Sequence, residues 1–257
     1  GVDNDNLAGM DELGNADGIM LLTINKNTQE LIMTSVLRDT RVEVPNDYGM
    51  KITSTYHKGG VPLLREVFEL NFNIPVDNYI LVNYLNVVDI IDALGGVDIE
   101  LTADEIKAMS GKIASIDKLV GAEQGTNAIS ADEAGLLHLN GVQTAAYMRI
   151  RPSSSGDDRG RTERARKVVA QVFDKVKGMS GSELLTFANG FLPNIETDMT
   201  DSELMTLAMN SEMLMGYARV SDRIPHDEDY ASSNDGNYYV LPDYDTVNEK
   251  LYESVYE

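Results

Sequence analysis

Two apolar runs joined by a short polar turn, GIMLLTINKNTQELIMTSVL at residues 18–37, constrain the fold more than any other stretch. Each run is rich in residues that favour strands, and the Lys26–Asn27 pair between them favours a turn, so the stretch predicts a β-hairpin. Because each run is largely apolar, we expect both faces of the hairpin to be covered. Such a hairpin needs other elements packed on each side of it.

The rest of the chain supplies candidate covering elements. Strand patterns recur at residues 41–45, 97–101 and 237–241, and helical patterns at residues 61–72, 140–151, 182–191, 201–215 and 244–256. Residues 78–96 run from a strand into a short helix that Gly95 and Gly96 should end. The segment RTERARKVVAQVFDKVKG carries Val168, Val172 and Phe173 on one face, which predicts an amphipathic helix over residues 161–175. No long linker interrupts the chain. We therefore predict an α/β fold with three α-β-α layers, a central mixed sheet with helices on both faces, forming a single domain over residues 1–257.

The overall charge narrows the possible partners. The 257 residues include 21 Lys and Arg against 42 Asp and Glu, a formal net charge of −21, which would repel DNA phosphates, so we expect no nucleic acid partner. The chain has no cysteine, which excludes disulfides and cysteine-ligated metals. No apolar run approaches the roughly 18 residues that span a bilayer. Because the chain begins Gly-Val-Asp, we expect that an N-terminal signal or anchor has been removed.

Against this acidic background, residues 149–167 (RIRPSSSGDDRGRTERARK) gather seven cations and three acidic residues. Arginine donates parallel hydrogen bonds to phosphate, and a helix N-terminus adds free N–H groups, so the stretch favours binding of a small anion such as a diphosphate. The candidate ligands are three arginines near predicted helix ends: Arg149, Arg151 and Arg161. The alternative is a solvated helix face with ion pairs such as Glu163 with Arg166 or Lys167. The residues alone leave both interpretations open.

Acidic side chains at predicted strand ends form a second candidate group. Asp3 and Asp17 lie before the hairpin, and Arg38 and Asp39 follow it in the motif SVLRDT. Carboxylates so placed can hold Mg²⁺, which takes oxygen ligands; the alternative is that they are ordinary loop acids. The three histidines, His57, His138 and His226, show no metal-ligand spacing, so we expect structural or surface roles for them. The acidic residues Asp227, Glu228 and Asp229 predict a solvated loop.

Three motifs occur in order along the chain: S-x-x-R-D in SVLRD, the run IDALGGVDI, and R-x-R followed by D-x-G-R-x-x-R. Together they resemble the LytR–CpsA–Psr family of bacterial cell-envelope proteins, over roughly residues 1–172. The resemblance implies a phosphotransferase on the extracellular face of the cytoplasmic membrane, held there by an N-terminal transmembrane helix that is absent from this sequence. It implies transfer of a glycopolymer, such as teichoic acid or capsule, from a polyprenyl-pyrophosphate carrier onto peptidoglycan. Two alternatives stay open: a phosphatase acting on the carrier, and a non-catalytic envelope regulator or transcription attenuator.

The resemblance also assigns roles to residues. It implies Mg²⁺, with Mn²⁺ as a possible substitute, bound by Asp3 and Asp17. It implies a substrate-binding set that surrounds the pyrophosphate: Arg38, Lys51, Arg149, Arg151, Asp158 and Arg161. The implied catalytic set is Asp17, Arg38, Asp39 and Arg149. Either Asp17 or Asp39 is the candidate base for the acceptor hydroxyl.

The chain departs from the family pattern at two positions. Ala165 stands where the family's helix usually has glutamine, and Gly18 replaces the commoner threonine after Asp17. The first change removes one side-chain hydrogen bond to the phosphates. We therefore expect weaker substrate binding than in a member that retains the glutamine.

Overall fold

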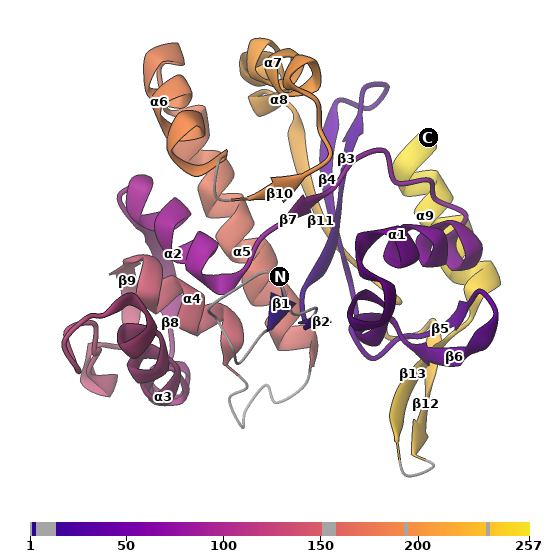
Figure 1. The fold of residues 1–257 in the computed structure, drawn as a ribbon, viewed down its shortest axis with the longest axis horizontal. Helices are drawn as coiled ribbons and strands as arrows, with labels where there is room; N and C mark the ends of the chain where they lie inside the picture. Colours follow the sequence, from indigo (N-terminus) through magenta and orange to yellow (C-terminus); the bar gives the residue numbers. More distant parts are fainter. Residues whose placement is uncertain (1, 4–13, 151–157, 193–194, 235–236) are drawn as a thin grey trace. The chain divides into compact units, whose positions relative to one another are not determined.

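The computed structural model describes residues 2–3, 14–150, 158–192, 195–234 and 237–257, with the backbone alone at residues 2, 3, 158, 181, 191 and 234 (Figure 1). The chain divides into two compact units, the first formed by residues 1–81 and 197–257 and the second by residues 82–196. Each unit buries a hydrophobic core of its own. The single domain expected from the sequence stays a prediction.

The first unit contains most of the strands. Its elements are β1 (Val2–Asp3), β2 (Asn15–Ala16), β3 (Ile19–Asn25), β4 (Glu30–Val36), β5 (Arg41–Val44), β6 (Asp47–Lys51), α1 (Ile52–Phe72), β7 (Ile80–Leu81), α7 (Asp201–Met209), α8 (Ser211–Met215), β11 (Ala218–Ile224), β12 (Tyr230–Asn234), β13 (Tyr238–Pro242) and α9 (Tyr244–Tyr256). A further short strand, β10 (Glu196–Thr197), pairs with β7.

A mixed three-stranded sheet with the order β11-β4-β3 lies at the centre of this unit. The hairpin predicted at residues 18–37 is β3 and β4, and its turn is fixed by Asn25, whose side-chain oxygen accepts hydrogen bonds from the backbone N–H groups of Asn27 and Thr28. Strand β11 then adds parallel to β4. The central strand β4 is buried almost throughout, as expected, whereas Leu22 on the edge strand β3 is 51% exposed. The expectation that both runs are covered on both faces therefore holds for β4 alone.

Helices α1 and α9 pack together beside the sheet and close the core of the first unit (Figure 1). The ring centroid of Phe72 lies 5.4 Å from that of Phe68 and 5.7 Å from that of Tyr244. The Asn71 side chain accepts a hydrogen bond from the N–H of Glu43 and donates one to its carbonyl, so the end of α1 is tied to β5. These contacts hold α1 against β5 and α9.

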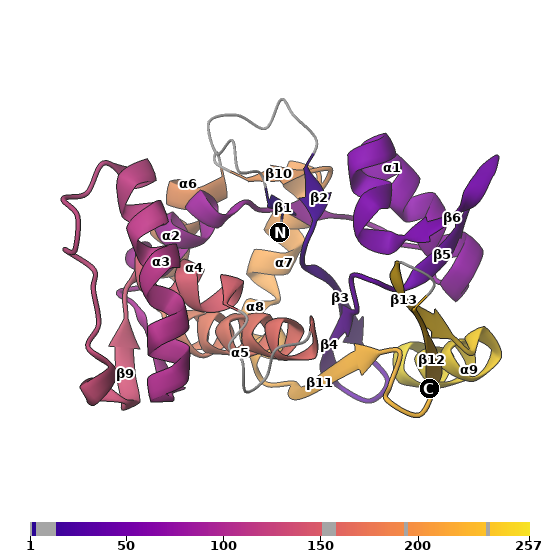
Figure 2. The same cartoon turned by 90° about the horizontal axis from the view of Figure 1, so that it is seen from below.

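The second unit is mainly helical. Its elements are α2 (Tyr84–Ala93), β8 (Val97–Leu101), α3 (Ala103–Val120), the 3₁₀ helix η1 (Ala131–Glu133), β9 (Gly135–Leu139), α4 (Gly141–Arg149), α5 (Asp158–Lys177) and α6 (Gly181–Phe191). Helix α4 lies at its centre and packs against α2, α3 and α5 (Figure 2). A Cβ at Gly141 would lie 2.2 Å from the carbonyl oxygen of Val88, so the close approach of α4 to α2 requires glycine there.

The predicted α/β fold with a mixed sheet and helices is confirmed. Several boundaries match closely: the short helix that ends before Gly95 and Gly96 is α2, and the helix predicted over residues 161–175 is α5. Both glycines have positive φ angles, 74° and 89°, which explains why the helix ends there. The single helix expected over residues 201–215 is instead α7 and α8, separated at Asn210.

Candidate active site

The open end of the β3–β4 hairpin brings Asp17 and Arg38 together. Ile19 pairs with Val36 in the antiparallel register, so the residues just outside these two positions face one another. The Asp17 carboxylate is buried and accepts a hydrogen bond from Nη1 of Arg38, whose side chain is 20% exposed. A buried carboxylate joined to a guanidinium is a charge-assisted pair that keeps the arginine in one place.

Asp39 and Lys51 extend this cluster. Nζ of Lys51 lies 2.7 Å from Oδ1 of Asp39, and Nε of Arg38 lies 4.0 Å from the same oxygen. Backbone hydrogen bonds hold the segment, because the Ile52 N–H donates to the Thr40 carbonyl at 2.8 Å and the Val240 N–H donates to the Asp39 carbonyl at 3.0 Å. The first unit thus gathers two cations and two carboxylates that the motifs had singled out. We call Asp17, Arg38, Asp39 and Lys51 the hairpin cluster.

Asp3 approaches this cluster through its backbone. Strand β1 pairs with β2 so that Asp3 lies opposite Asn15, two residues before Asp17. The side chain of Asp3 lies outside the described part of the structure. Carboxylates are oxygen donors of the kind that Mg²⁺ prefers, so the residue types are compatible with the expected metal, and the site itself stays a prediction.

The second unit holds the other predicted ligands. Arg149 is the last residue of α4, and its Cζ lies 4.6 Å from the centroid of the Tyr84 ring. Arg161 lies in the first turn of α5 and is only 6% exposed, which is unusual for an arginine. Asp158 begins α5, with its backbone alone described, and Arg151 lies outside the described residues. We call Arg149 and Arg161 the helix-end arginines.

The alternative of a solvated helix face holds for only part of this segment. Nζ of Lys167 lies 2.8 Å from the Glu163 carboxylate, with both side chains 56% exposed, as that alternative predicts. The hydrogen bond to Lys167 lowers the pKa of Glu163. Arg161 and Arg164, by contrast, are 6% and 3% exposed. A helix surface made only for solubility would leave these guanidiniums in water.

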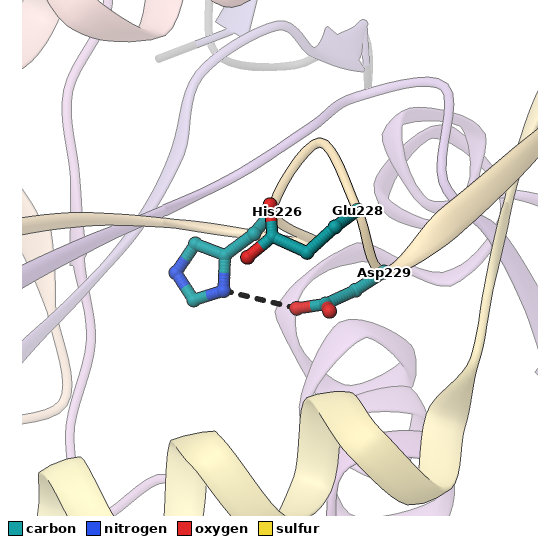
Figure 3. Close-up of side chains that lie close together, drawn as sticks. All are labelled: His226, Glu228 and Asp229. Atoms are coloured by element: carbon teal, nitrogen blue, oxygen red, sulfur yellow. Dashed lines mark hydrogen bonds and ion pairs between the residues drawn. The ribbon is translucent and has the colours of Figure 1, made fainter.

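One other group of potential metal ligands appears among the described residues: His226, Glu228 and Asp229 (Figure 3). The sequence suggested a solvated acidic loop here, and this is wrong for Asp229, which is 4% exposed. Nζ of Lys250 lies 2.8 and 2.7 Å from its two carboxylate oxygens and 3.2 Å from Oε1 of Glu228. Because the Lys250 ammonium group already pairs with both carboxylates, the group is an ion-pair network that joins the loop before β12 to α9.

His226 belongs to the same network and confirms the structural role expected for it. Its ring nitrogens lie 2.8 Å from Oδ1 of Asp222 and 3.0 Å from Oδ2 of Asp229. Burial alone would lower the pKa of His226, but the hydrogen bonds to Asp222 and Asp229 outweigh it and raise the pKa above its ordinary value. The protonated form of the histidine therefore stabilises this corner of the first unit.

A model of the LytR_cpsA_psr family matches residues 1–254. The chain belongs to the LytR–CpsA–Psr family. The resemblance inferred from the motifs is confirmed, and it extends beyond residue 172 to nearly the whole chain.

Within the LytR–CpsA–Psr family, the chain is 31% identical over 218 residues to the "Polyisoprenyl-teichoic acid--peptidoglycan teichoic acid transferase TagU" of Oceanobacillus iheyensis, which covers 79% of this chain and 61% of that protein. It is 26% identical over 198 residues to TagV of Bacillus subtilis, described as the same kind of transferase, covering 76% of this chain and 47% of that protein. The chain therefore spans about half to three fifths of these relatives' lengths.

A solved family structure shares the fold. It is described as "LytR-CPS2A-psr family protein YwtF (TagT) with bound octaprenyl pyrophosphate lipid", and it superposes with a TM-score of 0.69 at 20% identity. The match covers 95% of this chain and 86% of that one. Among the described helices of the present protein, none is long and apolar enough to cross a membrane.

Sequence reasoning assigned no role to Tyr84, whose ring contacts Arg149, or to Arg164, which donates a hydrogen bond to the carbonyl oxygen of Ile150 next to Arg149. Tyr84 was seen only as part of a strand-to-helix segment, and Arg164 only as the last arginine of the D-x-G-R-x-x-R motif, with no role assigned to it. The position of Tyr84 at the start of a helix gives no sign of its contact with Arg149. The signal that could have singled out Arg164 is the helical spacing itself, since it lies three residues after Arg161 and four before the buried Val168.

Proposed function

We propose that this chain is a phosphotransferase that moves a teichoic acid or a similar glycopolymer from a polyprenyl-pyrophosphate carrier onto peptidoglycan. The proposal is carried by the buried pairing of Asp17 with Arg38 at the hairpin end, where the family motif places a pyrophosphate ligand. It is supported by the names of two relatives as teichoic acid transferases and by the octaprenyl pyrophosphate bound to a solved family member. We further propose that the reaction takes place at the extracellular face of the cytoplasmic membrane, where the peptidoglycan acceptor lies and where an N-terminal anchor would hold the protein.

In the proposed reaction a peptidoglycan hydroxyl attacks the polymer-linked phosphorus of the carrier. A new P–O bond forms to the acceptor, the phosphoanhydride bond breaks, and the polyprenyl phosphate leaves with the bonding electrons. Arg38 and Arg149 stabilise the negative charge that develops on the phosphate oxygens, because preorganised donors need no rearrangement during the reaction. Lys51, Arg151, Asp158 and Arg161 complete the proposed substrate-binding set.

The acceptor proton passes to a carboxylate in this proposal. Asp17 and Asp39 are both candidates, and each is already paired with a cation, Arg38 and Lys51 respectively. We propose Mg²⁺ as the cofactor, with Mn²⁺ as a substitute, held by Asp3 and Asp17. When bound there, the ion would offset charge on the phosphate oxygens.

The test is a transfer assay with a lipid-linked polymer, run with and without peptidoglycan. We expect polymer-linked peptidoglycan and polyprenyl phosphate as products, and neither without the acceptor. Polyprenyl phosphate released equally fast without peptidoglycan would instead identify a phosphatase acting on the carrier. No turnover, together with salt-sensitive binding to DNA, would favour the transcription attenuator.

Variants of Arg38 in the hairpin cluster and of Arg149 at the end of α4 sharpen this test. Arg38→Ala and Arg149→Ala should each raise the barrier by about 2–4 kcal/mol, a loss of roughly 30- to 1,000-fold in rate, as expected when one preorganised donor is removed. Lys167→Ala is the matched control, because its exposed ion pair with Glu163 contributes only about 0.3–0.5 kcal/mol. Transfer by Arg149→Ala at the parental rate would remove Arg149 from the site.

A further inference from the structure

The guanidinium of Arg149 lies over an aromatic ring. Its Cζ is 4.6 Å from the centroid of Tyr84, a residue that is 6% exposed in the first turn of α2. The capping box of Asn83 and Asn86 fixes the start of this helix. A cation within about 6 Å of a ring face is attracted by the ring, and the attraction increases where water is excluded. The Tyr84 ring therefore restricts where the Arg149 guanidinium lies.

A second contact holds the backbone beside Arg149. The side chain of Arg164 is buried, and its Nη2 donates a hydrogen bond of 2.6 Å to the carbonyl oxygen of Ile150. Ile150 is the next residue after Arg149 and ends α4 in an extended conformation, with φ −74° and ψ 153°. The last carbonyl groups of a helix have no partner within the helix, so a cation that binds there also fixes the direction of the chain. Arg164 thus ties α5 to the end of α4.

The burial of Arg164 is costly, which argues for a role beyond filling space. Burial lowers its pKa, and the charge is offset by Glu105, whose Oε1 lies 3.9 Å from Nη1, and by the Tyr147 ring, whose centroid lies 5.9 Å from Cζ. A buried ion pair is often no more stabilising than apolar residues of the same volume. What a buried guanidinium supplies, and an apolar side chain does not, is a directed donor to one carbonyl group.

We propose that Tyr84 and Arg164 are positioning residues, which together hold Arg149 in one orientation before substrate binds. Tyr84 sets the place of the guanidinium and Arg164 sets the backbone that carries it. This inference rests on the proposed function insofar as Arg149 binds the diphosphate. A donor held in advance loses less freedom on binding, so the two contacts should strengthen diphosphate binding through Arg149 alone.

The first experiment observes Arg149 without any ligand. A proton close to a ring face has a ring-current shift, so the Hε resonance of Arg149 should be displaced upfield in the parent protein. We expect the displacement to persist in Tyr84→Phe, which keeps the ring, and to disappear in Tyr84→Leu. In Arg164→Lys, which keeps the charge but loses the planar fork, it should shrink. A resonance that Tyr84→Leu leaves unmoved would overturn the inference, whatever the protein's activity.

The second experiment measures the consequence, with farnesyl pyrophosphate as a soluble probe. Tyr84→Leu should weaken binding about 2- to 30-fold, the range of one cation–π contact. Tyr84→Phe, which keeps the ring, should bind the probe as the parent protein does. Arg164→Met, which removes the charge, and Arg164→Lys, which keeps it, should each cause a loss of similar size. Arg164→Lys decides the question if Arg164→Met fails to fold. Lys167→Met, an exposed change on the same helix, should leave binding unchanged.

A double-mutant cycle separates positioning from general stability. If Tyr84 acts through Arg149, then Tyr84→Leu should add no further loss in the Arg149→Ala background. A full additional loss there would overturn the inference while leaving the proposed function intact. Failure of the parent protein to bind the probe or to transfer polymer would instead contradict the proposed function, and the resonance of Arg149 would still decide the positioning role.

Discussion

Ala165 lies four residues after Arg161 on α5, so the two side chains occupy the same face of the helix. In the resemblance drawn from the sequence, this position usually carries glutamine, which would donate to a phosphate oxygen. Ala165→Gln should therefore strengthen binding of a lipid pyrophosphate by at most about 1.5–3 kcal/mol, the worth of a hydrogen bond to a charged group. Calorimetric titration with farnesyl pyrophosphate checks this. Lys167→Gln is the control, and equal affinities for Ala165→Gln and the parent would contradict the prediction.

His226 links protonation to stability. Its pKa is raised in the folded protein by Asp222 and Asp229, whereas an unfolded histidine titrates near 6.5. Its contribution is therefore fully present below about pH 6.5 and is lost as the pH rises through the folded value. His226→Gln should lower the melting temperature most below about pH 6.5 and progressively less toward pH 9. Thermal melts at constant ionic strength measure this, and a deficit that does not change with pH would contradict it.

Local elements were largely predictable, because their signals lie within a few residues of one another. The β3–β4 hairpin, the end of α2 at Gly95 and the amphipathic α5 follow from periodicity and glycine placement. Strand β11 was not predicted, since it is recognised by its parallel pairing with β4, which lies more than 180 residues earlier. The same reason applies to Asp229, whose buried ion pair depends on Lys250 in α9.

In the candidate site, too, neighbours within one local element were predictable and contacts between distant elements were not. Asp17 and Arg38 were predictable as neighbours because they flank one hairpin. Tyr84 was not, because its contact with Arg149 joins the start of α2 to the end of α4, and no local pattern records that contact. The sequence motifs predicted which charged residues bind the substrate, and the structure adds side chains that contact two of them, Arg38 and Arg149.

The close packing of α4 against α2 can be tested by a substitution at Gly141. A Cβ at Gly141 would lie 2.2 Å from the Val88 carbonyl oxygen, so Gly141→Ala must separate the two helices. We expect a loss of about 1–3 kcal/mol in the free energy of unfolding, and weaker pyrophosphate binding because Arg149 ends α4.

The matched control is Gly111→Ala in α3. A Cβ at Gly111 would meet nothing within 4 Å, so alanine there should stabilise the protein by about 0.5–1 kcal/mol through its higher helix propensity. Thermal or denaturant unfolding of both variants distinguishes a close approach between helices from a general intolerance of substitution. If Gly141→Ala were as stable as Gly111→Ala, α4 could not be packed as described.

On the scale of the whole molecule, a net charge of −21 opposes the binding of an anionic carrier. Screening confines this repulsion to roughly 8 Å at physiological ionic strength, so binding depends on cations held close to the phosphates. The cations proposed for this role lie at the end of a hairpin in the first unit and at helix ends in the second. The acidic remainder disfavours other polyanions, so the proposed selection of a diphosphate would be a short-range property.

Removing the metal tests whether the proposed Mg²⁺ supplies part of the positive charge next to the phosphates. If Asp17 and Asp3 hold Mg²⁺, excess EDTA should abolish polymer transfer, while circular dichroism shows an unchanged fold. Adding back Mg²⁺ or Mn²⁺ should restore transfer and raise the melting temperature, because an ion that binds only the folded state stabilises it. Asp17→Asn should lose both responses. Asp201→Asn, an exposed acid at the start of α7, should keep both. Transfer that continues undiminished in excess EDTA would show that Arg38, Lys51 and Arg149 supply the positive charge without a metal.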